Sequence, residues 1–360
     1  MQIREITNYL ESLAPISSQE SYDNSGLIVG APTAEVSNVL ISLDCIESTV
    51  DEAIEKGCEL IIAHHPIVFR GLKKLNGKNY IERTVLKAIK NDIAIYAIHT
   101  NLDNYRFGVN HEIGQRIGLS DIQILQPKKE VLYKLICYIP TDHAEKVSQA
   151  IFDAGGGSIG DYDECGFETK GKGTFRPNDA AQPFIGTSGD RSSVEEVKFE
   201  AVCSNHKLSK VVGAMIAAHP YEEVAYEVFP MLNINAHEGS GMVGVLSEPM
   251  DTKKFLEHIK KIFNCGVIRH TDLVHDTIKK VAYCGGAGSF LLEAAKRSGA
   301  EVFITGDYKY HEFFDAEDGI IIADIGHYES EQYTSNRIAE ILTEKFATFA
   351  VHLTAVNTNP

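Results

Sequence analysis

The pattern of hydrophobic and polar positions predicts alternating helices and strands in the first third of the chain. Apolar residues at positions 3, 6, 10 and 13 form one helical stripe over Ile3–Leu13. Short apolar runs that are typical of strands then alternate with segments of helical spacing. The predicted strands are Asn38–Leu43, Glu59–Ala63 and Ile93–Ile98, and the predicted helices between them are 48–56 and 81–90. This alternation predicts an α/β fold with a mostly parallel sheet.

The pattern changes near Gln126 and changes back after Ala236. The segment between them predicts the order βαββαβ, which is typical of a ferredoxin-like α+β domain. Its strands are predicted at 131–139, 168–175, 197–203 and 224–230, and its helices at 141–154 and 207–218. A stretch rich in Gly, Pro, Ser and Asp, 176–193, is predicted to be a long loop. We therefore expect residues 127–235 to be a domain inserted into a discontinuous α/β domain of residues 1–126 and 236–360.

The segment after Ala236 resembles the first part of the chain. Its helices are predicted at 253–263, 290–298 and 330–345, and its strands at 280–284, 301–304 and 320–324. The strand, helix and glycine-led strand of 39–62 recur at 281–304 with a constant offset of 242 residues, which places His64-His65 opposite Gly306-Asp307. This offset favours an α/β domain made of two related halves. The alternative is that strand–helix–Gly–strand units resemble one another without any repeat.

Five residues with metal-binding side chains follow predicted strands. His64 and His65 come directly after the second strand, and Asp103 follows the third. His327 follows the last strand, and Glu331 lies four residues further, on the same face if a helix begins there. Parallel sheets place functional residues at the carboxyl ends of their strands. Imidazole and carboxylate groups gathered from several strand ends are ligands of divalent cations such as Zn, Fe, Mn, Ni and Co.

Two adjacent histidines at the end of a strand are expected to point apart, so that each would serve a different ion. Five protein ligands exceed the needs of one open tetrahedral site and suit two ions that share Glu331 and water molecules. Each motif also has an interpretation without metal, because a His-His-Pro sequence can simply end a strand and a His-x-x-x-Glu spacing arises by chance in helices. The hypothesis therefore depends on all five residues meeting in one place.

Composition narrows the class of protein. The 360 residues include 34 Lys and Arg against 50 Asp and Glu, a formal net charge of -16. Such acidity disfavours nucleic-acid binding. Seven cysteines without a C-x-x-C spacing indicate neither a disulfide framework nor a thiolate zinc site. The sequence shows no signal peptide or membrane-spanning segment, so we expect a soluble, cytoplasmic protein.

Five sequence motifs together resemble the NIF-three-like family, whose members are often called type-2 GTP cyclohydrolase I homologues. The motifs are YDNSGL at 22–27, AHHP at 63–66, HTNLD at 99–103, TGDYKYH at 305–311 and DIGHYESE at 324–331, and they occur in the family's order. The long bacterial form of the family carries an inserted domain similar to the PII and CutA folds. The segment HPYEEVAY at 219–226 resembles the signature of that insert. The resemblance thus implies a NIF-three-like α/β domain with a PII/CutA-like insert.

The resemblance also implies a dinuclear metal centre, whose ligands would be His64, His65, Asp103, His327 and Glu331. It implies a homohexameric toroid, a trimer of dimers, with the metal sites facing an internal cavity. The family label suggests opening of the GTP imidazole ring with loss of formate. Two residues depart from the family's usual pattern: Tyr22 replaces a Trp, and Met242 replaces an Arg, which puts phosphate recognition in doubt.

Two functions remain open at the level of sequence. The first is a hydrolase that uses two divalent cations on a small-molecule substrate. In it, His99 and His311 are candidates for proton transfer or substrate orientation, and Lys309 and Tyr310 are candidates for charge stabilisation. An alternative for His99 is that it is itself a metal ligand. The second is a metal-binding scaffold or metal-handling protein without catalysis. A role as a partner of other proteins has no support in the composition.

A glycine-rich segment, 285–289, lies between a predicted strand and a predicted helix. It either cradles a phosphate on backbone N–H groups or allows close packing of the strand and the helix. It lacks the spacing of a dinucleotide fingerprint, so no organic cofactor is predicted.

Overall fold

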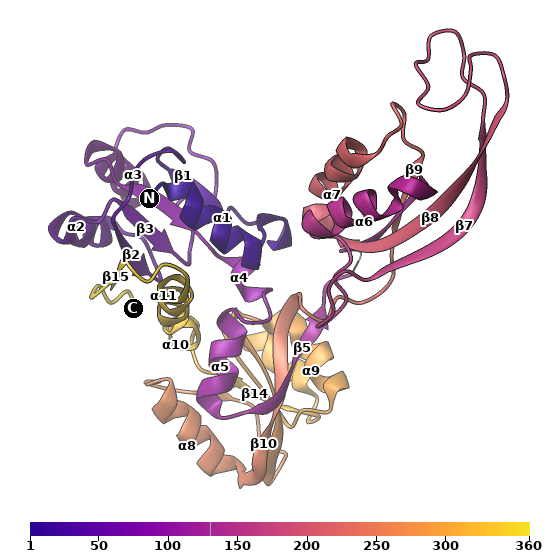
Figure 1. Ribbon diagram of the computed structural model, residues 1–360. Helices are drawn as coiled ribbons and strands as arrows, with labels where there is room; N and C mark the ends of the chain where they lie inside the picture. The colour runs from indigo at the N-terminus through magenta and orange to yellow at the C-terminus, as the bar shows by residue number, and fades with distance from the viewer. Residues whose placement is uncertain (130) are drawn as a thin grey trace. The chain divides into compact units, whose positions relative to one another are not determined.

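The chain folds into two units, one of which is discontinuous in sequence. The computed structural model describes residues 1–129 and 131–360 (Figure 1). Met1–Pro127 and His237–Pro360 form the discontinuous unit, and Lys128–Ala236 form the inserted unit. Within the described residues, no helix combines the length and the apolar character that a membrane crossing requires.

The first half of the discontinuous unit contains a five-stranded sheet in the order β1-β4-β3-β2-β15. Strands β4, β3, β2 and β15 run parallel, and β1 pairs with β4 in the antiparallel direction. The strands are β1 Gly26–Val29, β2 Asn38–Ser42, β3 Leu60–Ala63, β4 Ala94–Ala97 and β15 Ala350–Leu353. The helices are α1 Ile3–Leu13, α2 Glu47–Lys56, α3 Tyr80–Lys90 and α4 Thr100–Asp103. This sheet is mostly parallel, as the sequence predicts.

The second half contains a six-stranded sheet in the order β11-β14-β13-β12-β10-β5. Only β12, β13 and β14 are parallel, so the prediction of a mostly parallel sheet is wrong here. The chain leaves for the inserted unit along β5 and returns along β10 beside it, which makes those two strands antiparallel. The strands are β5 Ser120–Pro127, β10 Gly239–Asp251, β11 Arg269–His270, β12 Thr277–Ala287, β13 Val302–Gly306 and β14 Ile321–Asp324. The helices are α5 Val109–Ile117, α8 Thr252–Ile262, α9 Leu292–Ser298, α10 His327–Glu331 and α11 Thr334–Lys345.

The two sheets share one arrangement of four strands. The order β1-β4-β3-β2 in the first sheet corresponds to β11-β14-β13-β12 in the second, with the same parallel and antiparallel pairings. Val39 is the first residue of β2 that pairs with β3, and Val281 is the first residue of β12 that pairs with β13. These two residues are equivalent under the offset of 242 found in the sequence. The structure is therefore consistent with two related halves.

Both sheets are buried on both faces, and alternate residues of each strand enter different cores. In β2, Val39 and Ile41 enter a core that the two halves share, while Leu40 enters a separate core with α2 and α3. In β12, Val281 and Tyr283 enter the same shared core. The shared core is completed by apolar faces of α1, α5, α8 and α11. The two sheets are thus held together by one continuous hydrophobic core, and their carboxyl ends can contribute to one site.

The inserted unit is a four-stranded antiparallel sheet in the order β7-β8-β6-β9. Its elements are β6 Leu132–Pro140, α6 Ala144–Asp153, β7 Gly166–Phe175, β8 Ser192–Ser204, α7 Asn205–Ala218 and β9 Tyr226–Pro230. This is the βαββαβ order that the sequence predicts, and α6 and α7 cover one face of the sheet through a core of their own. The predicted loop after β7 lies at the far end of the long β7–β8 hairpin (Figure 1). A closer likeness to the PII and CutA folds stays a prediction.

One predicted helix is wrong in an informative way. Residues 330–345 do not form a single helix, because α10 ends at Glu331 and α11 begins at Thr334. The break is held by contacts with the end of α8: Gln332 Nε2 donates to the Phe263 carbonyl and the Tyr333 hydroxyl donates to the Ile262 carbonyl. Helical periodicity in a sequence does not reveal such tertiary hydrogen bonds. The break leaves α10 as a separate short helix that carries two candidate ligands.

Candidate metal centre

The five candidate ligands lie where the two halves of the discontinuous unit meet. His64 and His65 follow β3, and Asp103 ends α4, the short helix after β4. His327 and Glu331 are the first and last residues of α10, the short helix after β14. Strands β4 and β14 occupy corresponding places in the two sheets, so each half supplies ligands in a similar way. We call His64, His65, Asp103, His327 and Glu331 the histidine–carboxylate cluster.

The carboxylate of Glu331 lies at the centre of this cluster. Its Oε2 is 3.0 Å from Nε2 of His65 and 3.0 Å from Nε2 of His327. Its Oε1 is 3.9 Å from Nε2 of His64, which in turn is 3.6 Å from Oδ1 of Asp103. With each of these two pairs, Glu331 forms a group of ligand atoms that lie within 4.8 Å of one another and could hold a metal ion. One carboxylate therefore faces two separate pairs of donors.

Each imidazole of the cluster is fixed through its Nδ1 atom. Nδ1 of His64 lies 2.8 Å from the carbonyl oxygen of Ile98. Nδ1 of His65 lies 2.8 Å from Oδ1 of Asp44, and Nδ1 of His327 lies 2.8 Å from Oδ2 of Asp307. Oxygen acceptors at Nδ1 place the proton there and leave Nε2 as the donor atom for a cation. All three rings are thus oriented for ligation by the same device.

The expectation that His64 and His65 point apart is wrong. Their ring centroids are 4.9 Å apart, and both rings face the cluster. Strand β3 ends at Ala63, so the alternation of side chains between faces no longer applies to the two residues that follow it. The two rings nevertheless lie in different pairs around Glu331, His64 with Asp103 and His65 with His327.

The cluster strongly perturbs the imidazoles within it. Burial lowers the pKa of His65, but its hydrogen bonds with Asp44 and Glu331 outweigh burial and raise the pKa to about 10. Burial also lowers the pKa of His327, and its contacts with Glu331 and a second carboxylate raise it to about 9. His64 is fully buried, and burial holds its pKa below the ordinary value. Without a cation, the cluster therefore keeps protons on His65 and His327.

The two carboxylates of the cluster shift in opposite directions. Burial, and then the nearby charge of Glu331, hold the pKa of Asp103 well above its ordinary value. Burial would raise the pKa of Glu331 too, but the surrounding imidazoles hold it well below its ordinary value. Two neighbouring carboxylates whose pKa values are shifted in opposite directions indicate a site of concentrated charge, which is typical of functional sites.

Two buried atoms of the cluster lack hydrogen-bond partners within the described residues: Nε2 of His64 and Oδ1 of Asp103. Leaving a buried polar atom unpaired costs about 1–3 kcal/mol, so such atoms call for an explanation. Both atoms point into the same group with Glu331. Imidazole nitrogen and carboxylate oxygen are suitable donors for divalent transition metals. The residues therefore fit a cation at this place.

The glycine-rich segment packs tightly and offers no open phosphate cradle. The N–H groups of Gly285, Gly286 and Gly288 donate to the side chains of Asn110, Ser330 and Thr305, respectively. Gly286 also lies directly against the cluster, because a Cβ atom there would be 2.5 Å from Oε1 of Glu331. Its φ of +63° adds to the requirement for glycine. Of the two interpretations of this segment, the structure favours close packing.

His99 joins the cluster from the side of the first half. Its ring centroid is 5.3 Å from that of His64 and 5.4 Å from that of His65. Its Nδ1 lies 2.7 Å from Oδ1 of Asp23, a residue of the YDNSGL motif. Burial would raise the pKa of Asp23, but hydrogen bonds from His99 and Thr100 hold it well below its ordinary value. An ionised Asp23 thus fixes the tautomer of His99.

The remaining candidates lie elsewhere. His311 is exposed, contacts Tyr310 and a phenylalanine, and belongs to none of the possible ligand groups found among the described residues. Lys309 is exposed and pairs with Glu312. Met242 is 2% exposed and packs in the shared core, so its side chain offers nothing to a ligand in the cluster.

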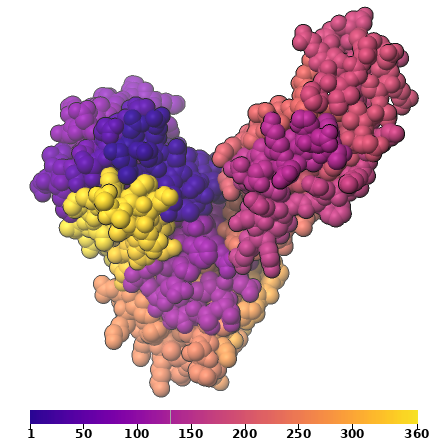
Figure 2. All heavy atoms as spheres, viewed as in Figure 1, coloured from indigo at the N-terminus to yellow at the C-terminus, as the bar shows by residue number. Residues whose placement is uncertain are grey.

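A cavity of about 550 Å³ adjoins the cluster. It reaches His65 and His327, and the C-terminal residues Thr358, Asn359 and Pro360 form one of its walls. The Thr358 hydroxyl donates to Asp44, which holds His65. Figure 2 shows the yellow C-terminal residues lying against the indigo and purple first half.

The sequence analysis missed the acceptors that orient the imidazoles and the C-terminal wall. A usable signal existed for two of the acceptors, since Asp44 follows β2 and Asp307 follows β13 at the carboxyl ends of strands. Asp307 also lies opposite His65 in the repeat. No comparable signal marks Thr358, which lies beyond the last strand.

Comparisons with known proteins cover the whole chain. The sequence model of the family described as Duf34/NIF3 (NGG1p interacting factor 3) matches residues 1–360. A Halalkalibacterium halodurans protein named GTP cyclohydrolase 1 type 2 homolog is 40% identical over 360 residues, covering 99% of this chain and 97% of that protein. A Bacillus subtilis protein of the same name is 37% identical over 362 residues, with the same coverage of 99% and 97%. The solved structure of a Bacillus cereus protein related to NIF3 is 38% identical with a TM-score of 0.86, and a Staphylococcus aureus structure is 31% identical with a TM-score of 0.79; each match covers 100% of this chain and 98% of the other.

Proposed function

This chain belongs to the Duf34/NIF3 family, and from that premise we propose that it is a hydrolase that depends on two divalent cations held by the histidine–carboxylate cluster. The observation that carries the proposal is the position of Glu331. Its two oxygens face two different pairs of donors, and each pair with Glu331 forms a group able to hold a cation. The orphaned atoms of His64 and Asp103 support the same assignment, because a cation would satisfy both.

When bound, two divalent cations would supply Lewis acidity and lower the pKa of a bound water toward neutrality. The chain's own residues provide the proton transfer. The Nδ1–H group of His99 donates a hydrogen bond to Asp23. The other ring nitrogen, Nε2, lies beside the cluster and is the atom that can exchange a proton with the substrate. The exposed ring of Phe69 lies next to His99, with a centroid separation of 6.2 Å, and the exposed ring of Tyr22 lies 6.1 Å from that of Phe69. The two rings form an apolar edge for a substrate.

The charge balance of the site indicates the substrate class. Two carboxylates belong to the cluster, and three more, Asp23, Asp44 and Asp307, each hold an imidazole. Two divalent cations would bring four positive charges against these five negative ones. Glu329 adds another carboxylate to the adjoining cavity, and no Lys or Arg is among the residues that line it. We therefore propose an uncharged or cationic small molecule rather than a nucleoside triphosphate as the substrate.

The name of the relatives points to a reaction of GTP. We keep hydrolysis as the type of reaction and propose a substrate other than a nucleoside triphosphate. The homohexameric toroid that the sequence resemblance implies stays a prediction. So does the cytoplasmic location.

The proposal is tested by assaying chelator-treated and Mn²⁺- or Zn²⁺-loaded protein on a panel of nucleosides, nucleotides, esters and phosphoesters. We expect turnover only in the loaded protein, and faster turnover of guanosine-like uncharged compounds than of their triphosphates. His99→Gln should lower kcat about 100-fold, because a positioned proton-transfer group contributes roughly that much. Metal content is measured on the same sample, since His99 also forms a possible ligand group with His64 and His65. His258→Gln, a substitution on α8 outside the cluster and its cavity, is the matched control and should behave like the unaltered protein.

One result would count against the hydrolase, and another against the proposed substrate class. If loaded protein turns over nothing in the panel, the metal-handling alternative is supported in its place. If triphosphates are the better substrates, the charge argument fails even though the metal site stands.

A further inference from the structure

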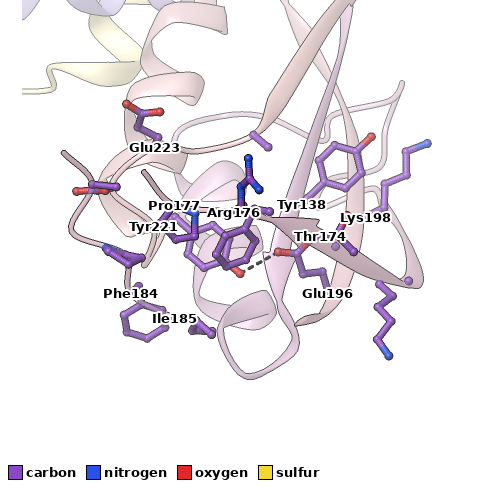
Figure 3. Close-up of a pocket in the computed structure, with 18 of the residues that line it drawn as sticks. Tyr138, Thr174, Arg176, Pro177, Phe184, Ile185, Glu196, Lys198, Tyr221 and Glu223 are labelled. Atoms are coloured by element: carbon purple, nitrogen blue, oxygen red, sulfur yellow. Dashed lines mark hydrogen bonds between the residues drawn. The ribbon is translucent and has the colours of Figure 1, made fainter. Parts of the chain in front are cut away.

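The inserted unit contains a cavity of about 660 Å³ that belongs to no part of the proposed metal site. It is lined by β7, by the loop after β7, and by the segment that follows α7 (Figure 3). Lys198 and Tyr138 alternate along their strands with core residues that face α6 and α7. They therefore point to the sheet face that the helices leave uncovered. A volume of this size suits a small ligand.

A buried carboxylate lies at the floor of the cavity. Glu196 is 8% exposed, and its Oε1 accepts a hydrogen bond of 2.8 Å from the Tyr221 hydroxyl (Figure 3). Gly173 makes room for this carboxylate, because a Cβ atom at Gly173 would lie 1.9 Å from Oε2 of Glu196. Burial, and then the carboxylate, raise the pKa of Tyr221, so the phenol remains a donor. A carboxyl group can accept more hydrogen bonds than the one from Tyr221, so it has room for the N–H groups of a ligand.

Aromatic rings form one side of the cavity. The centroid of Tyr221 is 5.9 Å from that of Phe175 and 6.3 Å from that of Phe184. Phe184 is 53% exposed, although the loop that carries it is held in place. One hydrogen bond that holds the loop runs from the Gln182 backbone N–H to Glu222, at 2.8 Å. Exposed aromatic surface on a held loop is suited to stacking a flat ring.

Cationic side chains occupy another side. Lys172 and Lys198 are paired with Glu195 and Glu200. Lys170 and Arg176 also line the cavity, and within the described part of the chain neither forms an ion pair. Arg176 lines the same cavity as Tyr221 and Glu196, and all three are labelled in Figure 3. An unpaired guanidinium next to a cavity is suited to bind a phosphate or carboxylate.

We propose that this cavity binds a flat heteroaromatic anion, represented by a purine nucleoside monophosphate. The base stacks on Phe184 and meets the edge of Tyr221, whose ring plane is inclined at 52° to that of Phe184, and its N–H groups face Glu196. The phosphate lies at Arg176. This site is independent of the metal cluster, so the proposal does not rest on the proposed function.

The test is isothermal titration calorimetry on the full chain after divalent cations have been removed with a chelator, so that the metal cluster contributes no binding heat. GMP is the probe, guanosine lacks the phosphate, and ribose 5-phosphate lacks the base. We expect saturable binding of GMP, weaker binding of guanosine, and none of ribose 5-phosphate. Arg176→Gln should weaken the binding of GMP at least about tenfold and leave the affinity for guanosine unchanged, because the lost contact is to the phosphate alone.

Two further variants complete the test. Phe184→Ala, at an exposed position where folding is not at stake, should weaken GMP and guanosine alike. Arg191→Gln removes an exposed arginine of the same unit that does not line the cavity, and it should leave both affinities unchanged. Absence of saturable GMP binding up to millimolar concentration overturns the proposal, and so does GMP binding that Arg176→Gln and Phe184→Ala leave intact.

Discussion

Glu331→Gln is expected to abolish the binding of both cations. The carboxylate is 3% exposed and faces all the other members of the cluster. Among the possible ligand groups found in the described residues, His64, His65 and His99 form the one that excludes Glu331, and that group has no carboxylate to balance the charge of a cation. Glutamine keeps the volume but removes the charge, and it turns one oxygen into an N–H donor beside imidazole nitrogens 3.0 Å away. Loss of a residue that merely orients a ligand costs about 10–100-fold in metal affinity, so loss of this shared ligand should cost more than that at each site.

The measurement is metal content by mass spectrometry after dialysis against micromolar Mn²⁺ or Zn²⁺. Glu329→Gln is the matched control, since Glu329 lies two residues away and contacts Asn359 rather than the cluster. It should retain the metal content of the unaltered protein. Asp103→Asn should lose one cation and keep the other, because Asp103 belongs to only one pair. A Glu331→Gln protein that still binds one cation tightly would show that the carboxylate is not shared.

The second large effect is a dependence of stability on pH that metal loading removes. In the metal-free protein the pKa values of His65 and His327 are raised from 6.5 to about 10 and about 9. A histidine whose pKa is higher in the folded state than in the unfolded state contributes its full stabilisation when the pH is below the unfolded-state pKa. That stabilisation is lost as the pH rises through the folded-state pKa. The metal-free protein should therefore lose stability steadily between about pH 6.5 and 10, with the smaller part of the loss coming from the more exposed His327. Bound cations replace the protons, so the loaded protein should lack this loss.

Thermal unfolding of chelator-treated and loaded protein at pH 6, 7.5 and 8.5 measures the effect. The melting temperature of the metal-free protein should fall by several degrees over this range. His65→Gln should reduce the fall, and His258→Gln, outside the cluster, should not. A metal-free protein whose stability is flat or rises over the same range would contradict the assignment of protons to these imidazoles.

Much of the discontinuous unit follows from local pattern. The helix over Ile3–Leu13 has the predicted bounds, because its apolar stripe faces a core that fixes it along its whole length. Strands such as β3 are predictable as uninterrupted apolar runs, since both of their faces are buried. Strands β5 and β10 were not predicted. They pair with each other around the insertion, and no short stretch of sequence contains that pairing.

The sequence predicts the candidate ligands that follow strands. It does not predict residues that reach a site only through hydrogen bonds between distant parts of the chain. Strand ends identified the five cluster residues, and the structure brings them together. The same rule applied to Asp44 and Asp307 would have found two of the acceptors. The cavity of the inserted unit was not foreseen, because Glu196 and Tyr221 are separated along the chain and are joined only by the hydrogen bond between them.

The central claim is that Glu331 lies between two cations. Anomalous diffraction from crystals of the Mn²⁺-loaded protein tests it most directly. The account predicts two peaks per chain on either side of the Glu331 carboxylate, one beside His65 and His327 and the other beside His64 and Asp103. One peak, or strong peaks away from these residues, would contradict it.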